Sequence, residues 1–152
     1  MDIKQKNSTR HIRTITTASI IIVMTIFLSC DKMDENGALD GNWQLTEWRD
    51  AETDSIIATR YTYKLYYTVK LNLIKFQDMG HIASPFCLAY FRHKGDSLMI
   101  DRAFIRPDDT DIPLDSLGKY GCPADGKFTI LKLTHDNMTL KSELGTLHFR
   151  KY

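Results

Sequence analysis

Residues 61–76 read YTYKLYYTVKLNLIKF and carry the clearest periodic signal in the chain. Apolar or aromatic residues stand at every odd position from 61 to 73, and the even positions between them are polar except at Tyr66. This alternation has the period of a β-strand with one buried and one solvated face. At Ile74 and Phe76 the apolar residues move to even positions, so we expect a β-bulge or a sharp bend there. A long, bent, half-buried strand is typical of a closing β-barrel.

Shorter strand patterns lie on both sides of this stretch. The first expected strand is Asn42–Arg49, and a polar loop with a short helical turn at Ile56–Thr59 leads from it to Tyr61. The later strands are expected at Phe86–His93, Ser97–Asp101, Gly126–Thr134, Met138–Ser142 and Thr146–Tyr152. Short strands at near-regular spacing predict an all-β fold, an antiparallel barrel of about eight strands, with a β-sandwich as the alternative.

One segment interrupts this rhythm. Arg106–Asp125 contains three prolines and two glycines, so we expect a long loop with a helical turn at Leu114–Tyr120. Long loops in compact domains are often lids or binding elements. The loop also holds four aspartates without the spacing of a calcium loop, and Asx turns explain them better than a metal site. These are Asp108, Asp109, Asp111 and Asp115.

The first thirty residues have the pattern of a bacterial lipoprotein leader. A basic start is followed by a mostly apolar, uncharged stretch at residues 15–28, which is shorter than the roughly 20 residues of a membrane span. It ends in Phe27-Leu28-Ser29-Cys30, which resembles a lipobox, where diacylglycerol is attached to the Cys and cleavage precedes it. We therefore expect a signal peptide at residues 1–29, a lipidated Cys30 with a tether through residue 38, and a folded domain over residues 39–152.

Lipidation changes the charge and cysteine counts. The full chain has 20 Lys plus Arg and 19 Asp plus Glu, and removal of residues 1–29 leaves 16 and 18, a net charge of −2. This balance gives no reason to expect nucleic acid as a partner. With Cys30 acylated, Cys87 and Cys122 remain, either as a disulfide that pins the long loop to the barrel or as two separate buried thiols. The anchor implies an outer-membrane location, on the periplasmic face or the cell surface.

Several short motifs carry a family resemblance. Gly41-Asn42-Trp43 opens the first strand and Arg150 lies on the last, and this combination resembles the lipocalins. The resemblance implies that the Trp43 indole packs at the closed end of a barrel beneath Arg150. Further segments resemble small lipocalin-like bacterial lipoproteins of unknown function, and together they extend the resemblance over most of residues 39–152. These segments are Tyr66–Leu73, Lys119–Gly121, Met138–Leu140 and Leu147–Tyr152.

Lipocalin-like barrels bind ligands inside, so residues that face inward are the candidate lining of a cavity. Tyrosine suits such a site because it combines an apolar ring with a hydroxyl that fixes a polar group. The alternative is that these side chains fill a small barrel as its core. The candidates are Tyr63, Leu65, Tyr67, Val69, Leu71, Phe91, Leu98 and Ile100.

No motif in the sequence predicts an enzyme, a metal site or a cofactor. The sequence has no Gly-x-Ser-x-Gly and no Gly-rich phosphate loop, and its histidines do not pair at metal-ligand spacing. We expect an envelope-anchored, non-enzymatic protein that binds a small, partly apolar ligand. The alternative function is an interaction or accessory module of an envelope complex, with contacts through Tyr61, Tyr66 and the long loop.

Overall fold

The computed structural model describes residues 35–80 and 86–152, which belong to the second of the chain's two compact units, residues 34–152. The expected signal peptide, Cys30 and the first part of the tether lie outside the described residues. None of the described helices is long and apolar enough to cross a membrane. In chain order the elements are η1 (Gly37–Leu39), β1 (Gly41–Arg49), β2 (Ile56–Thr59), β3 (Leu65–Lys70), β4 (Leu73–Asp78), β5 (Cys87–Lys94), β6 (Ser97–Ile105), β7 (Thr110–Ile112), η2 (Leu114–Tyr120), β8 (Lys127–Leu133), β9 (Asn137–Ser142) and β10 (Gly145–Lys151).

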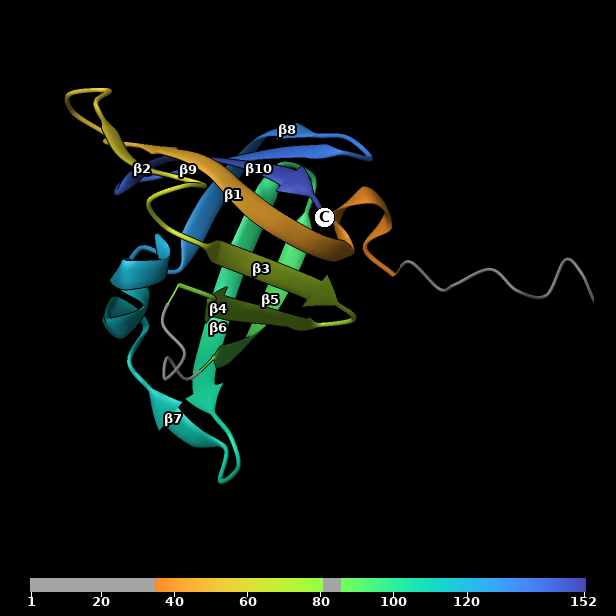
Figure 1. Cartoon of the computed structure of the whole chain (residues 1–152). Coiled ribbons are helices and arrows are strands. Elements are labelled where there is room, and N and C mark those ends of the chain that lie inside the picture. Colours follow the sequence, from red (N-terminus) through yellow and green to blue (C-terminus); the bar gives the residue numbers. More distant parts are fainter. Residues whose placement is uncertain (1–34, 81–85) are drawn as a thin grey trace, which may run out of the picture. The chain divides into compact units, whose positions relative to one another are not determined.

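Eight of these strands form a closed antiparallel ring (Figure 1). Their order around the ring is β1-β3-β4-β5-β6-β8-β9-β10, and β10 pairs with β1 to complete it. β2 and β7 stand outside the ring, where β2 pairs with β1 and β7 with β6. The structure therefore confirms the expected barrel of about eight strands over the β-sandwich.

The two short 3-10 helices lie at opposite ends of the ring (Figure 1). η1 leads directly into β1, at the end where β1 starts and β10 finishes. η2 leads toward β8, at the other end, where β5 starts and the β6–β7 hairpin projects. We call the end with η1 the base of the barrel and the end with η2 the mouth.

The stretch at residues 61–76 is not one bent strand, as we expected, but the larger part of a hairpin. β3 and β4 pair directly, with Lys70 opposite Leu73, so Leu71 and Asn72 form a two-residue turn. Leu71 has a φ of 55°, and a positive φ at the first central residue is a feature of type II′ hairpin turns. The turn explains why the buried side chains stand at odd positions in β3 and at even positions from Ile74 onward, because the chain reverses direction between the two strands.

Two further segments differ from expectation. Ile56–Thr59 is the strand β2 and not a helical turn, because its backbone pairs with β1 from Glu47 to Arg49. The long loop contains the expected helical turn, which is the 3-10 helix η2. It also contains the short strand β7, which pairs antiparallel with the end of β6.

The base of the barrel is closed by Trp43, but its cationic partner is Lys151 and not Arg150. Trp43 is fully buried and its indole N–H donates to the carbonyl of Leu39 in η1 at 2.8 Å. In the β1–β10 register Trp43 lies opposite Lys151, whose Nζ stands 4.9 Å from the centre of the indole ring. Arg150 lies opposite Gln44 on the outer face and donates two hydrogen bonds to its side-chain oxygen. Side chains alternate between the two faces of a strand, so Lys151 shares the face of Trp43 while its neighbour Arg150 lies on the opposite face.

Gly41 makes room for this arrangement. A Cβ at Gly41 would lie 2.6 Å from the Cε of Lys151, whose stem passes over the start of β1 before Nζ donates to the carbonyl of Ala38 at 3.1 Å. The Gly-x-Trp motif therefore combines space at its first residue with the buried ring at its third.

The domain begins earlier than the expected boundary at residue 39. The Asn36 side-chain amide donates to the carbonyl of Leu71 at 2.7 Å and to the Asp40 carboxylate at 2.6 Å. Residues 36–38, which we assigned to the tether, are therefore held against the base of the barrel.

Ring closure depends on a glycine at the start of β10. Gly145 has a φ of 132°, and a Cβ there would lie 1.9 Å from the carbonyl oxygen of Arg49 on β1. Gly145→Ala should lower the free energy of unfolding by about 2–4 kcal/mol, because backbone strain and a steric clash add up. Urea unfolding followed by tryptophan fluorescence measures this change.

The matched control is Gly118→Ala in η2, where a Cβ would meet no heavy atom of the described residues within 4 Å. This control should change the free energy of unfolding by less than about 1 kcal/mol. Equal losses in the two variants would contradict the role of Gly145 in closing the ring.

Candidate functional site

Aromatic rings fill the barrel between β10 and η2. Tyr67 on β3 is edge-on to Phe76 of β4, with ring centres 4.7 Å apart, and its ring lies 4.6 Å from that of Phe149 on β10. Phe76 in turn stacks on Tyr120, the last residue of η2, at 6.0 Å. All four rings are buried. Favourable ring–ring packing therefore occupies this part of the interior.

Two tyrosine hydroxyls hold η2 over the mouth. The Tyr63 hydroxyl donates to the carbonyl of Lys119 at 2.8 Å, and the Tyr67 hydroxyl donates to the carbonyl of the next residue, Tyr120. The two tyrosines are four residues apart, so both can face the same side of the chain as it enters β3. The Lys119–Gly121 segment noted in the sequence therefore contains the two carbonyls through which η2 is hydrogen-bonded to the barrel wall. We call η2 the lid of the barrel.

A small pocket lies between this lid and the barrel rim. It has a volume of about 210 Å³ and is formed by the start of β5, the end of β6, β7 and η2. Most of its wall is apolar, and the Lys119 side chain brings a cation to it. We call it the mouth pocket, and its lining residues are Cys87, Ile105, Ile112, Ser116, Leu117, Lys119 and Tyr120.

Two cysteine thiols and two tyrosine hydroxyls around the mouth stay uncharged near neutral pH. Burial raises the pKa of Cys87 to about 11 and that of Cys122 to about 12. Burial also raises the pKa of Tyr63 to about 12 and holds that of Tyr67 well above its usual value. A protonated thiol is a poor nucleophile, so the environment of Cys87 favours packing and not covalent chemistry. Lys119 is therefore the one formal charge among the seven lining residues.

The predicted cavity residues divide into three groups. Six of them are buried in one continuous core: Leu65, Tyr67, Val69, Phe91, Leu98 and Ile100. Tyr63 is half-buried at the mouth, and its hydroxyl is used by η2. Leu71 was predicted to face inward, but it is 49% exposed because it occupies the β3–β4 turn. None of the eight lines the mouth pocket.

The possible disulfide between Cys87 and Cys122 is not formed in the structure. Cys87 and Cys122 are both buried free thiols. The Cys87 Sγ lies 3.6 Å from the carbonyl of Phe104, and the Cys122 Sγ lies 3.6 Å from that of Pro123. Each thiol donates to a main-chain carbonyl, and the second of the two arrangements left open by the sequence is the one observed.

Sequence reasoning missed the residues that form the mouth pocket. Ile105, Ile112 and Leu117 come from three separate elements, β6, β7 and η2. Their signal in the sequence was the proline-rich loop at 106–125, which suggested a lid without showing which side chains face the barrel. Isolated apolar residues in such a loop have no periodicity to indicate their direction.

The aspartates of the long loop at residues 106–125 do not form a cluster. Asp111 pairs with Arg102 at 2.6 Å, and Asp109 lies 3.9 Å from Arg106. No cluster of metal-ligating side chains occurs within the described residues.

The ring, the plugged base and the lidded mouth define a class of protein. A closed eight-stranded antiparallel barrel with a buried tryptophan at one end and a short helix over the other is a small lipocalin-type barrel. Barrels of this class commonly hold one small ligand. The chain belongs to the lipocalin-like domain family, whose model matches residues 23–152. The resemblance indicated by Gly41-Asn42-Trp43 is thereby confirmed.

Solved structures show the same fold at low identity. A lipocalin-like protein from Bacteroides uniformis ATCC 8492 is 18% identical with a TM-score of 0.56, over 76% of this chain and 100% of the other. An uncharacterized protein from Bacteroides eggerthii DSM 20697 is 20% identical with a TM-score of 0.52, over 74% and 98%. A protein from Burkholderia xenovorans is 14% identical with a TM-score of 0.50, over 74% and 82%. No curated protein matches the chain.

The lid contact provides a direct test of the mouth. Tyr67→Phe should lower the free energy of unfolding by about 1–3 kcal/mol, because the buried carbonyl of Tyr120 loses its donor. Amide hydrogen exchange in η2 should also become faster than in the wild type, and mass spectrometry of the exchanged peptides measures it.

Tyr63→Phe is the matched control, since the Tyr63 hydroxyl is exposed enough for water to replace it at Lys119. Its effect on stability and on exchange should be smaller than that of Tyr67→Phe. If neither variant changed the rate of amide hydrogen exchange in η2, the tyrosine hydroxyls would not be what holds η2 over the mouth.

Proposed function

We propose that this protein is a lipid-anchored envelope protein that binds a small, partly apolar ligand at the mouth pocket. The observation that carries the proposal is an apolar pocket between η2 and the barrel rim, in which Lys119 is the only charged residue among the described lining residues. The family supports it, because lipocalin-like barrels commonly bind small hydrophobic molecules.

The size and chemistry of the pocket limit the ligand. A volume of about 210 Å³ is below the roughly 300–1,000 Å³ of pockets for drug-sized molecules. The apolar part of the ligand would lie against Ile105, Ile112 and Leu117. The Lys119 Nζ, 4.9 Å from the centre of the Tyr120 ring, would face a polar or acidic end. A small molecule or one end of an acyl chain fits this description.

The proposed anchor sets a limit on where the mouth can lie. Five residues lie between Cys30 and Asn36, and the six chain steps that join them span at most about 20 Å. Asn36 is bonded to the base of the barrel through Leu71 and Asp40. Lipidated Cys30 would therefore hold the base near the membrane, and the ligand would reach the mouth from the opposite end of the barrel.

A second function is favoured by a separate surface. β2 stands outside the ring, and its residues Ile56 and Ile57 are 52% and 48% exposed. Tyr61, which follows β2, is 77% exposed beneath the guanidinium of Arg60. Exposed apolar residues on an edge strand suit a protein partner, as in an accessory subunit of an envelope complex.

Ligand binding is tested with N-phenyl-1-naphthylamine, an apolar probe that fluoresces when it leaves water. The wild type should bind it saturably. Ile112→Asp should weaken the Kd at least about fivefold, because a carboxylate in the apolar pocket must be desolvated when the probe binds. Fluorescence titration of the domain from residue 34 measures the Kd.

Leu131→Asp is the matched control, because Leu131 is 56% exposed on β8, away from the mouth. It should leave the probe affinity unchanged. If the wild type binds no probe while an envelope protein co-purifies in stoichiometric amount, the second function replaces the first.

Lipidation is tested by metabolic labelling with palmitate. The wild type should carry the label and sediment with membranes, since two or more acyl chains give stable anchoring. Cys30→Ser should abolish both the label and cleavage of residues 1–29. Label that persists in Cys30→Ser would refute the proposed anchor site.

A further inference from the structure

The outer wall of the barrel carries a row of four polar side chains on four neighbouring strands. Glu47 on β1 lies opposite His148 on β10, which lies opposite Thr139 on β9, which in turn lies opposite Lys132 on β8. Directly opposed residues share one face of a sheet, with Cβ atoms about 4.5–5.5 Å apart. The row therefore brings a carboxylate, an imidazole, a hydroxyl and an ammonium group onto one strip of the wall.

Two β-bulges produce this alignment. The β1–β10 register shifts between Leu45 and Glu47, so Thr46 is the additional residue on β1. The β8–β9 register shifts between Ile130 and Lys132, so Leu131 is the additional residue on β8. Bulges of this kind re-aim side chains and are often found next to functional sites. Both occur on the strands that flank the β9–β10 hairpin, at the level of the row.

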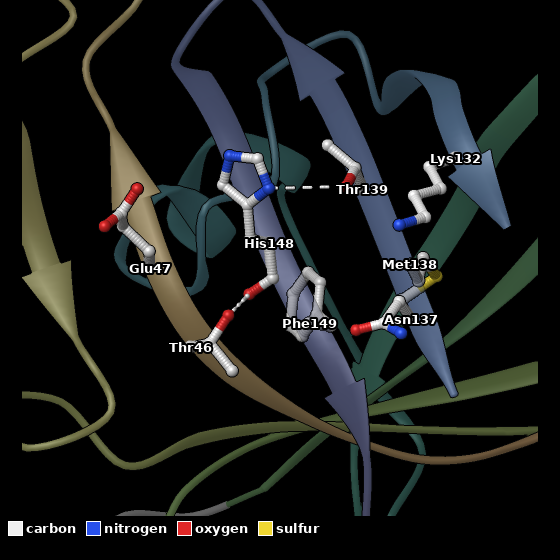
Figure 2. Close-up of a pocket in the computed structure, with 8 residues that line it drawn as sticks. All are labelled: Thr46, Glu47, Lys132, Asn137, Met138, Thr139, His148 and Phe149. Carbon is white, nitrogen blue, oxygen red and sulfur yellow. Dashed lines mark hydrogen bonds between the residues drawn. The ribbon is translucent and has the colours of Figure 1, made fainter. Parts of the chain in front are cut away.

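A pocket of about 370 Å³ lies on this strip (Figure 2). We call it the wall pocket. The residues that matter to its chemistry are the row itself with Thr46 and Asn137, and the buried Met138 and Phe149 lie beneath.

Two threonine hydroxyls at the wall pocket are held in place by hydrogen bonds with His148. The Thr46 hydroxyl donates to the carbonyl of His148 at 3.0 Å, and Thr139 Oγ1 lies 3.3 Å from His148 Nδ1. Figure 2 shows the Thr139 contact beside the ammonium group of Lys132 and the amide of Asn137. Among the described residues Lys132 forms no ion pair.

The charge around the wall pocket is mostly positive. The Glu47 carboxylate is paired with Arg49, and in Figure 2 it turns away from the His148 ring. Two residues along the strands from the row lie Arg150, opposite Asn137, and Lys141, opposite Thr146. The nearby Asp136 contacts its neighbour His135 at 2.7 Å. Lys132, Arg150 and Lys141 together exceed the available negative charge, so the local field favours an anion.

We propose that the wall pocket binds a small polar molecule through an oxyanion, either a carboxylate or a phosphate group. The Lys132 ammonium and the Asn137 amide would donate to its oxygens, with Thr139 and His148 beside them. Charge-assisted hydrogen bonds of this type are stronger than neutral ones. The site is separate from the mouth pocket, with which it shares no lining residue.

Isothermal titration of the whole protein, as purified in neutral detergent, tests this site, with inorganic phosphate and citrate as separate probes. Sodium chloride at equal ionic strength controls for screening. At least one probe should bind saturably, and the stronger one identifies the oxyanion. Lys132→Gln should weaken that Kd at least about fivefold, because the ammonium is lost while the stem is kept.

Lys70→Gln is the matched control, since Lys70 is an exposed lysine on the outer face of β3. It should leave the Kd unchanged. Thr139→Val, which preserves shape without the hydroxyl, should also weaken binding and gives a second readout if Lys132→Gln alters stability. Equal weakening by Lys70→Gln and Lys132→Gln, or no saturable binding of either probe, would overturn the proposal. Because Ile112→Asp should not affect this Kd, failure here is distinct from failure at the mouth pocket.

Discussion

The pairing of β1 with β10 is the constraint on which the rest of the structure depends. It joins strands about a hundred residues apart in the sequence, and it turns an open sheet into a ring in which every ring strand has two neighbours. Closure separates an inner face, where Trp43 and Tyr67 are fully buried, from an outer face that meets solvent. It also brings the two ends of the domain together, since the Tyr152 N–H donates to the carbonyl of Asn42 at 2.8 Å. A closed ring leaves no edge among its eight strands, so β2 and β7 are the short edge strands in the described part of the chain.

Aromatic side chains pack across the interior between β10 and η2, and this part of the barrel therefore offers no room to a ligand among the described residues. The interior of an eight-stranded barrel can either be filled by its own side chains or hold one small ligand. Here Tyr67, Phe76, Phe149 and Tyr120 pack ring against ring, and the Tyr67 hydroxyl already serves the main chain of η2. Tyrosine, which suggested a ligand contact in the sequence, therefore serves at position 67 to hold η2 against the barrel. The mouth pocket and the wall pocket both lie outside this packed part of the interior.

The sequence predicted most of the ring strands and their closure into a barrel, but it merged β3 with β4, missed β2 and β7, and did not predict register. Strand periodicity at residues 65–70 and 97–101 reports burial locally, and both segments are strands. The turn at Leu71 was missed because leucine is not a usual residue at positive φ. The exchange of Arg150 for Lys151 over Trp43 depends on how β10 aligns with β1, and no local pattern encodes that alignment. The polar row on the wall was missed for the same reason, since it exists only through two bulges and three inter-strand registers.

The two proposed sites differ in rigidity. The wall pocket is built on four hydrogen-bonded strands, so its geometry is fixed before a ligand arrives, whereas the mouth pocket depends on η2 and the hydroxyls that hold it. Contacts connect them, because Phe149 beneath the wall pocket packs on Tyr67, which bonds to Tyr120. Contact alone is not coupling, which requires a second arrangement that both ligands favour. Moving Tyr67 would break a buried hydrogen bond and two ring contacts, and that cost makes independent sites the consistent interpretation.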